Sequence, residues 1–245
     1  MNVGRFAEGC VCWIDLGTPD IDVTQTFYHD LFGWSVAPPD PSGYRLAAIR
    51  GQLVAALGPA EDPGVPYWTI SMMVADIRAA TTRLADAGAD ILIGPTAAGP
   101  HGHYAVARDP VGAPISLWQP GAHLGMQRAH EPGTFAGVSL LTDQPERAVS
   151  FYRAAWGWHT DDSQAEFWLP DSSIAPIRPA PGASTSQKSL WLVRFASADI
   201  DADVTRARQL GATQVESDPS TSVTLRDPTG ALFGLVQGGR TSAAG

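Results

Sequence analysis

The sequence predicts an α+β protein built from four tandem strand–helix–strands modules. Two repeats support this prediction. The phrase FYHDLFGW at residues 27–34 returns as FYRAAWGW at residues 151–158, and DPVG at 109–112 returns as DPTG at 227–230. Self-similarity of this kind is typical of a duplicated structural unit. Helix caps, alternating strands and turn glycines then divide each half once more, into modules of about 50–60 residues.

The duplication also predicts the domain boundaries. We expect an amino-terminal pair of modules at residues 1–120 and a carboxy-terminal pair at 134–245. The segment between them, 121–133, has the sequence GAHLGMQRAHEPG. Its glycines and proline disfavour a regular element, so it is predicted to be a linker.

The first module shows the expected order of elements. Residues 10–17 alternate as CVCWIDLG, which predicts a strand. Thr18 is a candidate helix cap, followed by a proline and an acid in the first turn. An apolar stripe at Val23, Phe27 and Leu31 predicts the helix itself, and Gly33 its end. Two further strands are expected around Arg50-Gly51, a hairpin signal.

The second module repeats that order. YWTISMMVA at 67–75 predicts a strand. Asp76 is the expected cap of a helix whose Ile77, Ala80 and Leu84 face inward, with Gly88 ending it. The strands HYAVAR and APISLWQ follow, joined by residues 109–112, whose proline and glycine suit a type I turn.

Composition excludes several classes of function. The formal net charge is −9 and no basic stripe is present, which argues against nucleic-acid partners and anionic membranes. No apolar run is long enough to span a bilayer, and no signal-peptide pattern opens the chain, so a cytoplasmic protein is expected. The two cysteines, Cys10 and Cys12, are predicted to pack in the core rather than to bind metal.

The repeated phrases resemble those of the vicinal oxygen chelate superfamily, which includes glyoxalase I, bleomycin-resistance proteins and extradiol dioxygenases. The strand–TPD–helix–FY…LFGW pattern, the helix ending AGA and the DPVG and DPTG turns carry this resemblance over nearly the full chain. It is greatest to two-half actinobacterial glyoxalase-like or hydroxylase-like members. The resemblance implies βαβββ modules that form two curled, U-shaped mixed-sheet cups with the helices outside.

Metal-dependent members of the superfamily place four ligands inside a cup, on first and last strands of the modules. Such sites use His, Glu or Gln side chains. Alignment on the repeated phrases places the eight equivalent positions at Trp13, Thr69, Ala55 and Ser116, and at Gly137, Leu192, Ala175 and Gly234. Because none is a usual ligand, we expect no metal and no other cofactor.

Strand alternation predicts which neighbours share each cup with these positions. Asp15 accompanies Trp13, and Ser71 accompanies Thr69. The remaining predicted ligand-binding residues of the amino-terminal cup are Trp68, Ser116 and Trp118; those of the other cup are Trp168, Trp191 and Arg194. The tryptophans could instead pack the core, and Arg194 could bridge the two halves.

Three residues are candidates for chemistry. Asp15 in an apolar cup would have a raised pKa that suits a general acid or base, unless it faces water at an edge. His103 could move protons, and Tyr104 could donate a hydrogen bond to a ligand oxygen. With His101, these last two belong to a glycine-flanked loop, where a solvated histidine is equally compatible with the pattern.

These features support three hypotheses. The first is a metal-independent tailoring enzyme of secondary metabolism that acts on an aromatic polyketide-like molecule, by cyclisation, dehydration or oxygenation. The second is a protein that binds and sequesters a drug without catalysis. The third is a metal-dependent lyase or dioxygenase whose ligands the alignment misses. A small aromatic molecule is the expected partner, a homodimer is a further expectation, and the pairing of the modules stays open.

Overall fold

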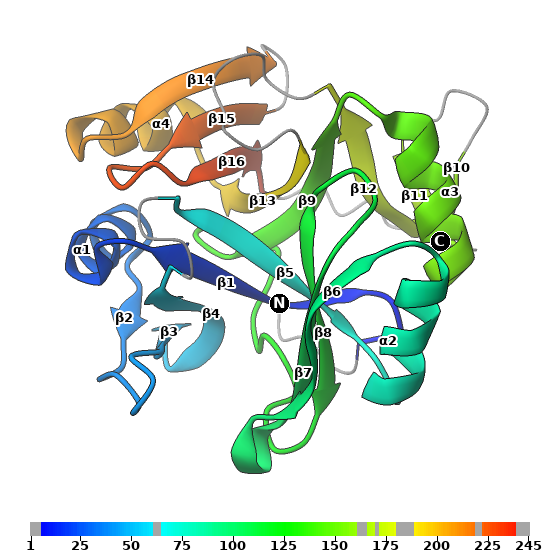
Figure 1. The fold of residues 1–245 in the computed structure, drawn as a ribbon. Helices are drawn as coiled ribbons and strands as arrows, with labels where there is room; N and C mark the ends of the chain where they lie inside the picture. The colour runs from blue at the N-terminus through cyan, green and yellow to red at the C-terminus, as the bar shows by residue number, and fades with distance from the viewer. Residues whose placement is uncertain are drawn as a thin grey trace.

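The computed structural model describes residues 6–60, 65–160, 166–169, 172–179, 189–218 and 222–238. These residues form two eight-stranded mixed sheets, one from each half of the chain, together with four α-helices (Figure 1). The predicted α+β fold of four βαβββ modules is confirmed.

Each sheet joins two consecutive modules. In the amino-terminal sheet the first strands of the two modules, β1 and β5, pair in antiparallel fashion at its centre. This pairing answers the question that the sequence left open. From edge to edge the strands are β2 (Ser35–Val36), β3 (Arg45–Ile49), β4 (Gln52–Pro59), β1 (Val11–Thr18), β5 (Tyr67–Met73), β8 (Pro114–Pro120), β7 (Gly102–Arg108) and β6 (Asp90–Ala97).

The carboxy-terminal sheet repeats this arrangement strand for strand. Its central antiparallel pair is β9 with β13. The order is β10 (His159–Thr160), β11 (Glu166–Leu169), β12 (Ser172–Arg178), β9 (Phe135–Thr142), β13 (Ser189–Ser197), β16 (Leu232–Gln237), β15 (Ser222–Arg226) and β14 (Thr213–Asp218). The duplicated sequence therefore encodes a duplicated sheet.

The four helices begin at polar caps or at proline. They are α1 (Ile21–Phe32), α2 (Ile77–Asp86), α3 (Pro145–Trp156) and α4 (Ile200–Gln209). Asp76 caps α2 as predicted, through bonds from two backbone N–H groups. The cap of α1 is Asp20 rather than the expected Thr18, because Thr18 still belongs to β1. Of the predicted apolar stripe of α1, Phe27 and Leu31 are buried, but Val23 is exposed.

The helices lie in two pairs at the ends of the molecule, α1 with α4 and α2 with α3 (Figure 1). Arg83 of α2 lies over the ring of Trp156 of α3, with its guanidinium carbon 4.9 Å from the ring centroid. None of the helices among the described residues is long and apolar enough to cross a membrane.

One aromatic core joins the two halves. Tyr28 of α1 stacks on Trp34, with ring centroids 5.1 Å apart, and contacts Phe195 and Phe233 of the other sheet at 6.2 and 5.9 Å. Packing of this kind removes a large apolar area from water on both sheets. The helix-bearing faces of the sheets are therefore turned inward, and the opposite faces, the cups, are turned away from the core.

The repeated phrases meet across the halves. The Tyr28 hydroxyl donates to Asp227 Oδ2 at 3.2 Å, and the Tyr152 hydroxyl donates to Asp109 Oδ2 at 2.7 Å. The other carboxylate oxygen of each aspartate accepts backbone N–H groups within and just after its own DPVG or DPTG turn. Each FY phrase of one half is thus bonded to the DP turn of the other half, which explains why both phrases recur.

Candidate active site in the amino-terminal cup

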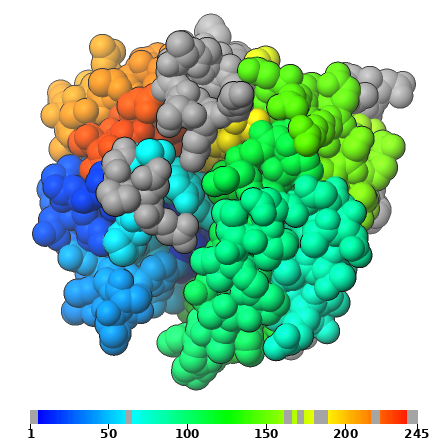
Figure 2. Space-filling view, viewed as in Figure 1, coloured from blue at the N-terminus to red at the C-terminus, as the bar shows by residue number. Residues whose placement is uncertain are grey.

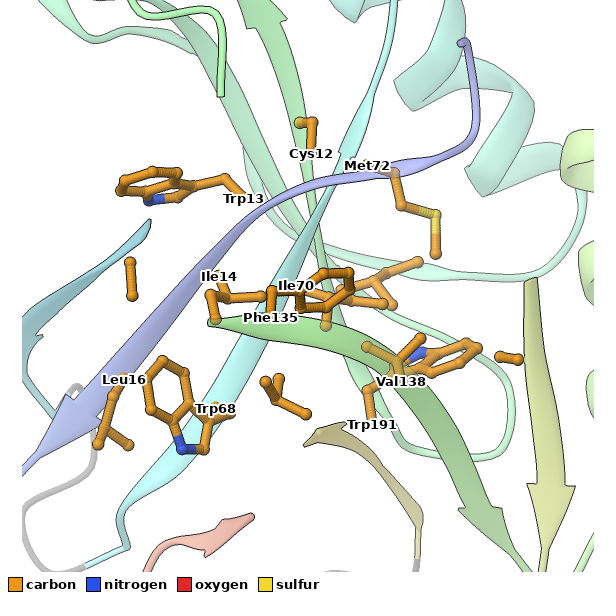
Figure 3. Packing of buried hydrophobic residues seen from close by; sticks show 14 of the residues in the cluster. Cys12, Trp13, Ile14, Leu16, Trp68, Ile70, Met72, Phe135, Val138 and Trp191 are labelled. Carbon is orange, nitrogen blue, oxygen red and sulfur yellow. The ribbon is translucent and has the colours of Figure 1, made fainter. Parts of the chain in front are cut away.

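A carboxylate held by two aromatic donors lies on the cup face of β1. Trp13 Nε1 donates to Asp15 Oδ1 at 2.8 Å, and the Tyr44 hydroxyl donates to the same oxygen. Trp13 Nε1 also lies 3.0 Å from the Tyr44 hydroxyl oxygen. Trp13 and Asp15 share a face because side chains two positions apart on a strand point the same way. Figure 3 shows Trp13 on the opposite side of β1 from Ile14 and Leu16.

The second carboxylate oxygen of Asp15 is not held in the same way. Asp15 is half-buried, and its Oδ2 makes no hydrogen bond with a described residue. Figure 2 shows a hollow between the blue surface of β2, β3 and β4 and the green surface of β7 and β8, the two sides of this cup.

Burial sets the protonation of this group. Burial raises the pKa of Asp15 to about 6, against the opposing effect of the bonds from Tyr44 and Trp13. Burial, reinforced by the negative charge of Asp15, holds the pKa of Tyr44 well above its ordinary range. At neutral pH the carboxylate is therefore mostly ionised and the phenol keeps its proton, as a general base with a fixed donor requires.

The segment between the halves contributes a histidine to this cup. The His123 ring meets Trp13 edge-on at a centroid distance of 4.4 Å, and Trp118 at 5.5 Å. Burial lowers the pKa of His123 to about 4, and His101 adds to that shift, so the imidazole is neutral at pH 7. Its Nε2 is buried and has no hydrogen-bond partner in the described part of the chain.

Backbone contacts hold this segment against the sheet. Met126 N–H donates to the Cys12 carbonyl at 2.8 Å, and Gln127 N–H donates to the Leu53 carbonyl at 2.8 Å. Cys12 itself is buried, and its thiol donates to the Ser71 carbonyl. Residues 121–133 were predicted as a linker, and the described contacts show that they also pack on β1 and β4.

The predicted polar residues of the cup are mostly at its floor. Ser71 lies opposite Trp13, and Ser116 lies beside Ser71. Both are buried, and the Ser116 hydroxyl donates to the Ala105 carbonyl at 3.1 Å. Thr69 pairs directly with Asp15 and is half-buried. The alternation that predicted these three positions therefore places them on one face.

The predicted loop residues separate onto two faces. Tyr104 pairs with Trp118, so both face the cup, and Trp118 Nε1 donates to the His123 carbonyl at 2.8 Å. His103 pairs with Gln119, whose side chain accepts the Ile77 N–H at the start of α2. His103 is therefore exposed on the helix side of the sheet, turned away from the cup, and its predicted catalytic role there is not supported.

Three further residues predicted to bind a ligand do not face a cup or are exposed. Trp68 and Trp191 are buried in the core, where their Nε1 atoms donate to the Tyr28 and Tyr152 hydroxyls at 3.3 and 2.9 Å. Both alternate with cup residues and so face away from the cups, as Figure 3 shows for Trp68. His101 is exposed, and its backbone carbonyl accepts the Gly121 and His123 N–H groups.

The carboxy-terminal cup is built differently. Arg194 lies between Gly137 and Gly234, its register partners on β9 and β16. Nearby leucines, Leu141, Leu192 and Leu232, form a small buried cluster. Trp168 is half-buried, and by alternation with the buried Phe167 it faces this cup. Arg194 donates to a carbonyl of its own sheet, so the interpretation that it bridges the halves is not supported.

The central positions of the two cups carry none of the usual ligands of a divalent metal. The central register positions are Trp13, Ser71 and Ser116 in one cup. In the other they are Gly137, Arg194 and Gly234. In the described ranges no three His, Cys, Asp or Glu side chains come together as metal ligands. Hydroxyls, an indole and a guanidinium do not replace imidazole and carboxylate ligands.

Comparison with known proteins places these features in a family. The family model described as "Glyoxalase-like domain" matches residues 12–118 and 137–236. Two relatives are 34% identical, each covering 95% of this chain and 94% of the relative: anthracycline biosynthesis protein DauV of Streptomyces sp. (strain C5) and DnrV of Streptomyces peucetius. The solved 2,3-dioxygenase LapB of Pseudomonas sp. KL28 covers 96% of this chain and 94% of its own, with 13% identity and a TM-score of 0.67.

Proposed function

Because the chain belongs to the glyoxalase-like domain family, we propose that it is a metal-independent tailoring enzyme of secondary metabolism. Its substrate would be an aromatic polyketide-like molecule, and its chemistry proton transfer in the amino-terminal cup. Two relatives named for anthracycline biosynthesis support the substrate class. The observation that carries the chemistry is Asp15, with one carboxylate oxygen held by Trp13 and Tyr44 and the other free to meet a ligand.

Asp15 is the catalytic base of this proposal. Its Oδ2 would remove a proton from a carbon next to a carbonyl, or from a phenol, and return it at a later step. Tyr44 and Trp13 keep the carboxylate oriented because both bond to Oδ1. A base with a pKa near 6 is ionised at neutral pH and still able to hold a proton transiently.

Three other residues would bind the substrate. Trp118 and the ring of His123 supply flat surfaces on which an aromatic ring can stack or meet edge-on. Tyr104, on the same face as Trp118, could donate to a carbonyl or phenolate oxygen as negative charge develops there. Dehydration and aldol cyclisation both begin when Asp15 removes a proton next to a carbonyl to give an enolate. In dehydration the enolate breaks the carbon–oxygen bond of a hydroxyl, which leaves as water with the proton from Asp15; in cyclisation it forms a carbon–carbon bond to a second carbonyl, whose oxygen takes that proton.

The test uses purified, chelator-treated protein and anthracycline-type aglycones, with products followed by mass spectrometry. Cyclisation leaves the mass unchanged, dehydration removes one water, and oxygenation adds one oxygen atom. We expect turnover without added metal, and its loss in Asp15→Asn. His103→Ala is the matched control, because His103 lies on the other face of the sheet. Stoichiometric binding of unchanged ligand would instead identify a sequestering protein, and turnover that needs metal would contradict the proposal.

A further inference from the structure

The carboxy-terminal cup contains a half-buried cation where the amino-terminal cup contains an indole. Arg194 of β13 is level with Gly137 of β9 and Gly234 of β16. Trp13 of β1 is level with Ser71 of β5, and Ser71 with Ser116 of β8. The guanidinium therefore projects from the centre of the second sheet onto its cup face.

Two glycines make room for this side chain. A Cβ at position 234 would lie 2.8 Å from Arg194 Cγ, and a Cβ at position 137 would lie 3.4 Å from Arg194 Nη2. The first distance is shorter than any ordinary contact. The glycine at position 234 therefore leaves the space that the arginine side chain occupies, and Gly137 lies against the guanidinium.

The Arg194 guanidinium has a hydrogen-bond donor without an acceptor in the described part of the chain. Arg194 Nη2 donates to the Val138 carbonyl at 2.8 Å. Arg194 Nε is buried and makes no hydrogen bond with any residue that the structure describes. Leaving a charged donor buried without an acceptor is costly, so an acceptor supplied by a ligand would be bound favourably. The planar fork of arginine suits a carboxylate in particular.

The charge state of Arg194 follows from its surroundings. Burial and, to a lesser extent, the charge of Arg178 lower the pKa of Arg194 to about 10, and the charge of Glu166 opposes that shift. Arg194 is therefore protonated at neutral pH. Arg194, Arg178 and Glu166 together carry a formal charge of +1, in a protein whose net charge is −9. This local positive charge favours an anionic ligand.

The buried end of the cup is apolar. Leu141, Leu192 and Leu232 pack together at the buried end, with the half-buried Leu190 and Val215 against them. We propose that Arg194 is the anion-binding subsite of the carboxy-terminal cup, which takes an organic carboxylate with an apolar or aromatic body. This site is separate from the base in the amino-terminal cup and does not depend on turnover there.

The test measures binding of 2-naphthoate to the full-length protein by titration calorimetry, with 2-naphthamide as the neutral ligand of equal shape. We expect naphthoate to bind more tightly than naphthamide. Arg194→Met should weaken naphthoate binding at least about tenfold, the usual worth of a bond to a charged group, and leave naphthamide nearly unchanged. Glu166→Gln should strengthen naphthoate binding, because it removes the opposing charge.

Two controls keep the outcome specific. Arg153→Met removes an exposed arginine from α3 and should not change binding. In protein labelled with ¹⁵N-arginine, the Nε–H resonance that disappears in Arg194→Met should shift when naphthoate is added, and a merely structural arginine would not respond. Absence of naphthoate binding, equal binding of the two ligands, or unchanged affinity in Arg194→Met would overturn the proposal, whatever Asp15→Asn does to turnover.

Discussion

The two cups are built on one backbone plan but are filled from different strands. At the central level, β1 supplies the large side chain of the amino-terminal cup, Trp13, and small residues face it from β5 and β8. In the carboxy-terminal cup β13, the counterpart of β5, supplies Arg194, and glycines face it. Each cup has space for one large group at this level. Duplication followed by divergence could therefore place an indole with a base in one cup and a cation in the other.

A substitution in one cup should change the activity assigned to that cup and leave that of the other cup unchanged. Asp15→Asn should reduce turnover by at least about 100-fold, the usual contribution of a general base, while naphthoate binding stays unchanged. Asparagine keeps an oxygen that can accept from Trp13 and Tyr44, so the fold should persist. Steady-state kinetics and calorimetry on Asp15→Asn and on Arg194→Met check this. Loss of naphthoate binding in Asp15→Asn would show that the cups are not independent.

Glycine at position 234 should contribute to the stability of the fold because it leaves space for the Arg194 side chain. Gly234→Ala places a carbon 2.8 Å from Arg194 Cγ, so we expect the free energy of unfolding to fall by about 1–3 kcal/mol. Adding Arg194→Ala should recover most of that loss, since the clash is removed. Ser71→Ala, at the level of Trp13 in the other cup, removes an atom and should cost less than about 1 kcal/mol. Urea denaturation measures all three, and equal costs for Gly234→Ala with and without Arg194 would contradict the steric explanation.

Much of the fold could be predicted because its signals are local and repeated. The DPVG and DPTG phrases, the caps such as Asp76 and the alternation of β1 each act within a few residues. Their assembly was harder to predict. The Tyr28–Asp227 and Tyr152–Asp109 bonds join residues far apart in sequence, so the phrases could be recognised as repeats without revealing that they meet across the halves.

The site was predicted only in part, for identifiable reasons. Asp15 and Trp13 follow from strand alternation, and the same rule would have excluded Trp68, which lies next to Thr69 and so faces the core. Tyr44 directly precedes β3 and lies two positions before Leu46, so the same alternation would have placed both residues on the cup face, but it was not applied to that strand. His123 has no local signal, because its place depends on backbone bonds between residues 121–133 and two distant strands.

Protonation of Asp15 should also appear in stability. Its pKa is about 6 when folded and about 4 when unfolded, so the folded state holds more protons between these values. The free energy of unfolding therefore falls as pH rises through this window, by about 1–2 kcal/mol after allowance for its partial exposure. Asp15→Asn should remove that part of the slope. Exposed Asp86→Asn controls for the loss of a carboxylate, and an identical slope in Asp15→Asn and the parent protein would show that Asp15 titrates normally.

The smallest expected effect is a shift in the pH dependence of activity when the Tyr44 hydroxyl, which donates to Asp15, is removed. The Tyr44 hydroxyl stabilises the ionised form of Asp15, so its removal in Tyr44→Phe should raise the pKa of that carboxyl. If Asp15 acts as the base, kcat/KM declines below about pH 6, and Tyr44→Phe moves this decline to higher pH by less than about one unit. Arg194→Met should leave the profile in place, because the guanidinium belongs to the other cup. A pH–rate profile of the three proteins decides the matter: a decline that stays fixed in Tyr44→Phe would assign the titrating group to a residue other than Asp15.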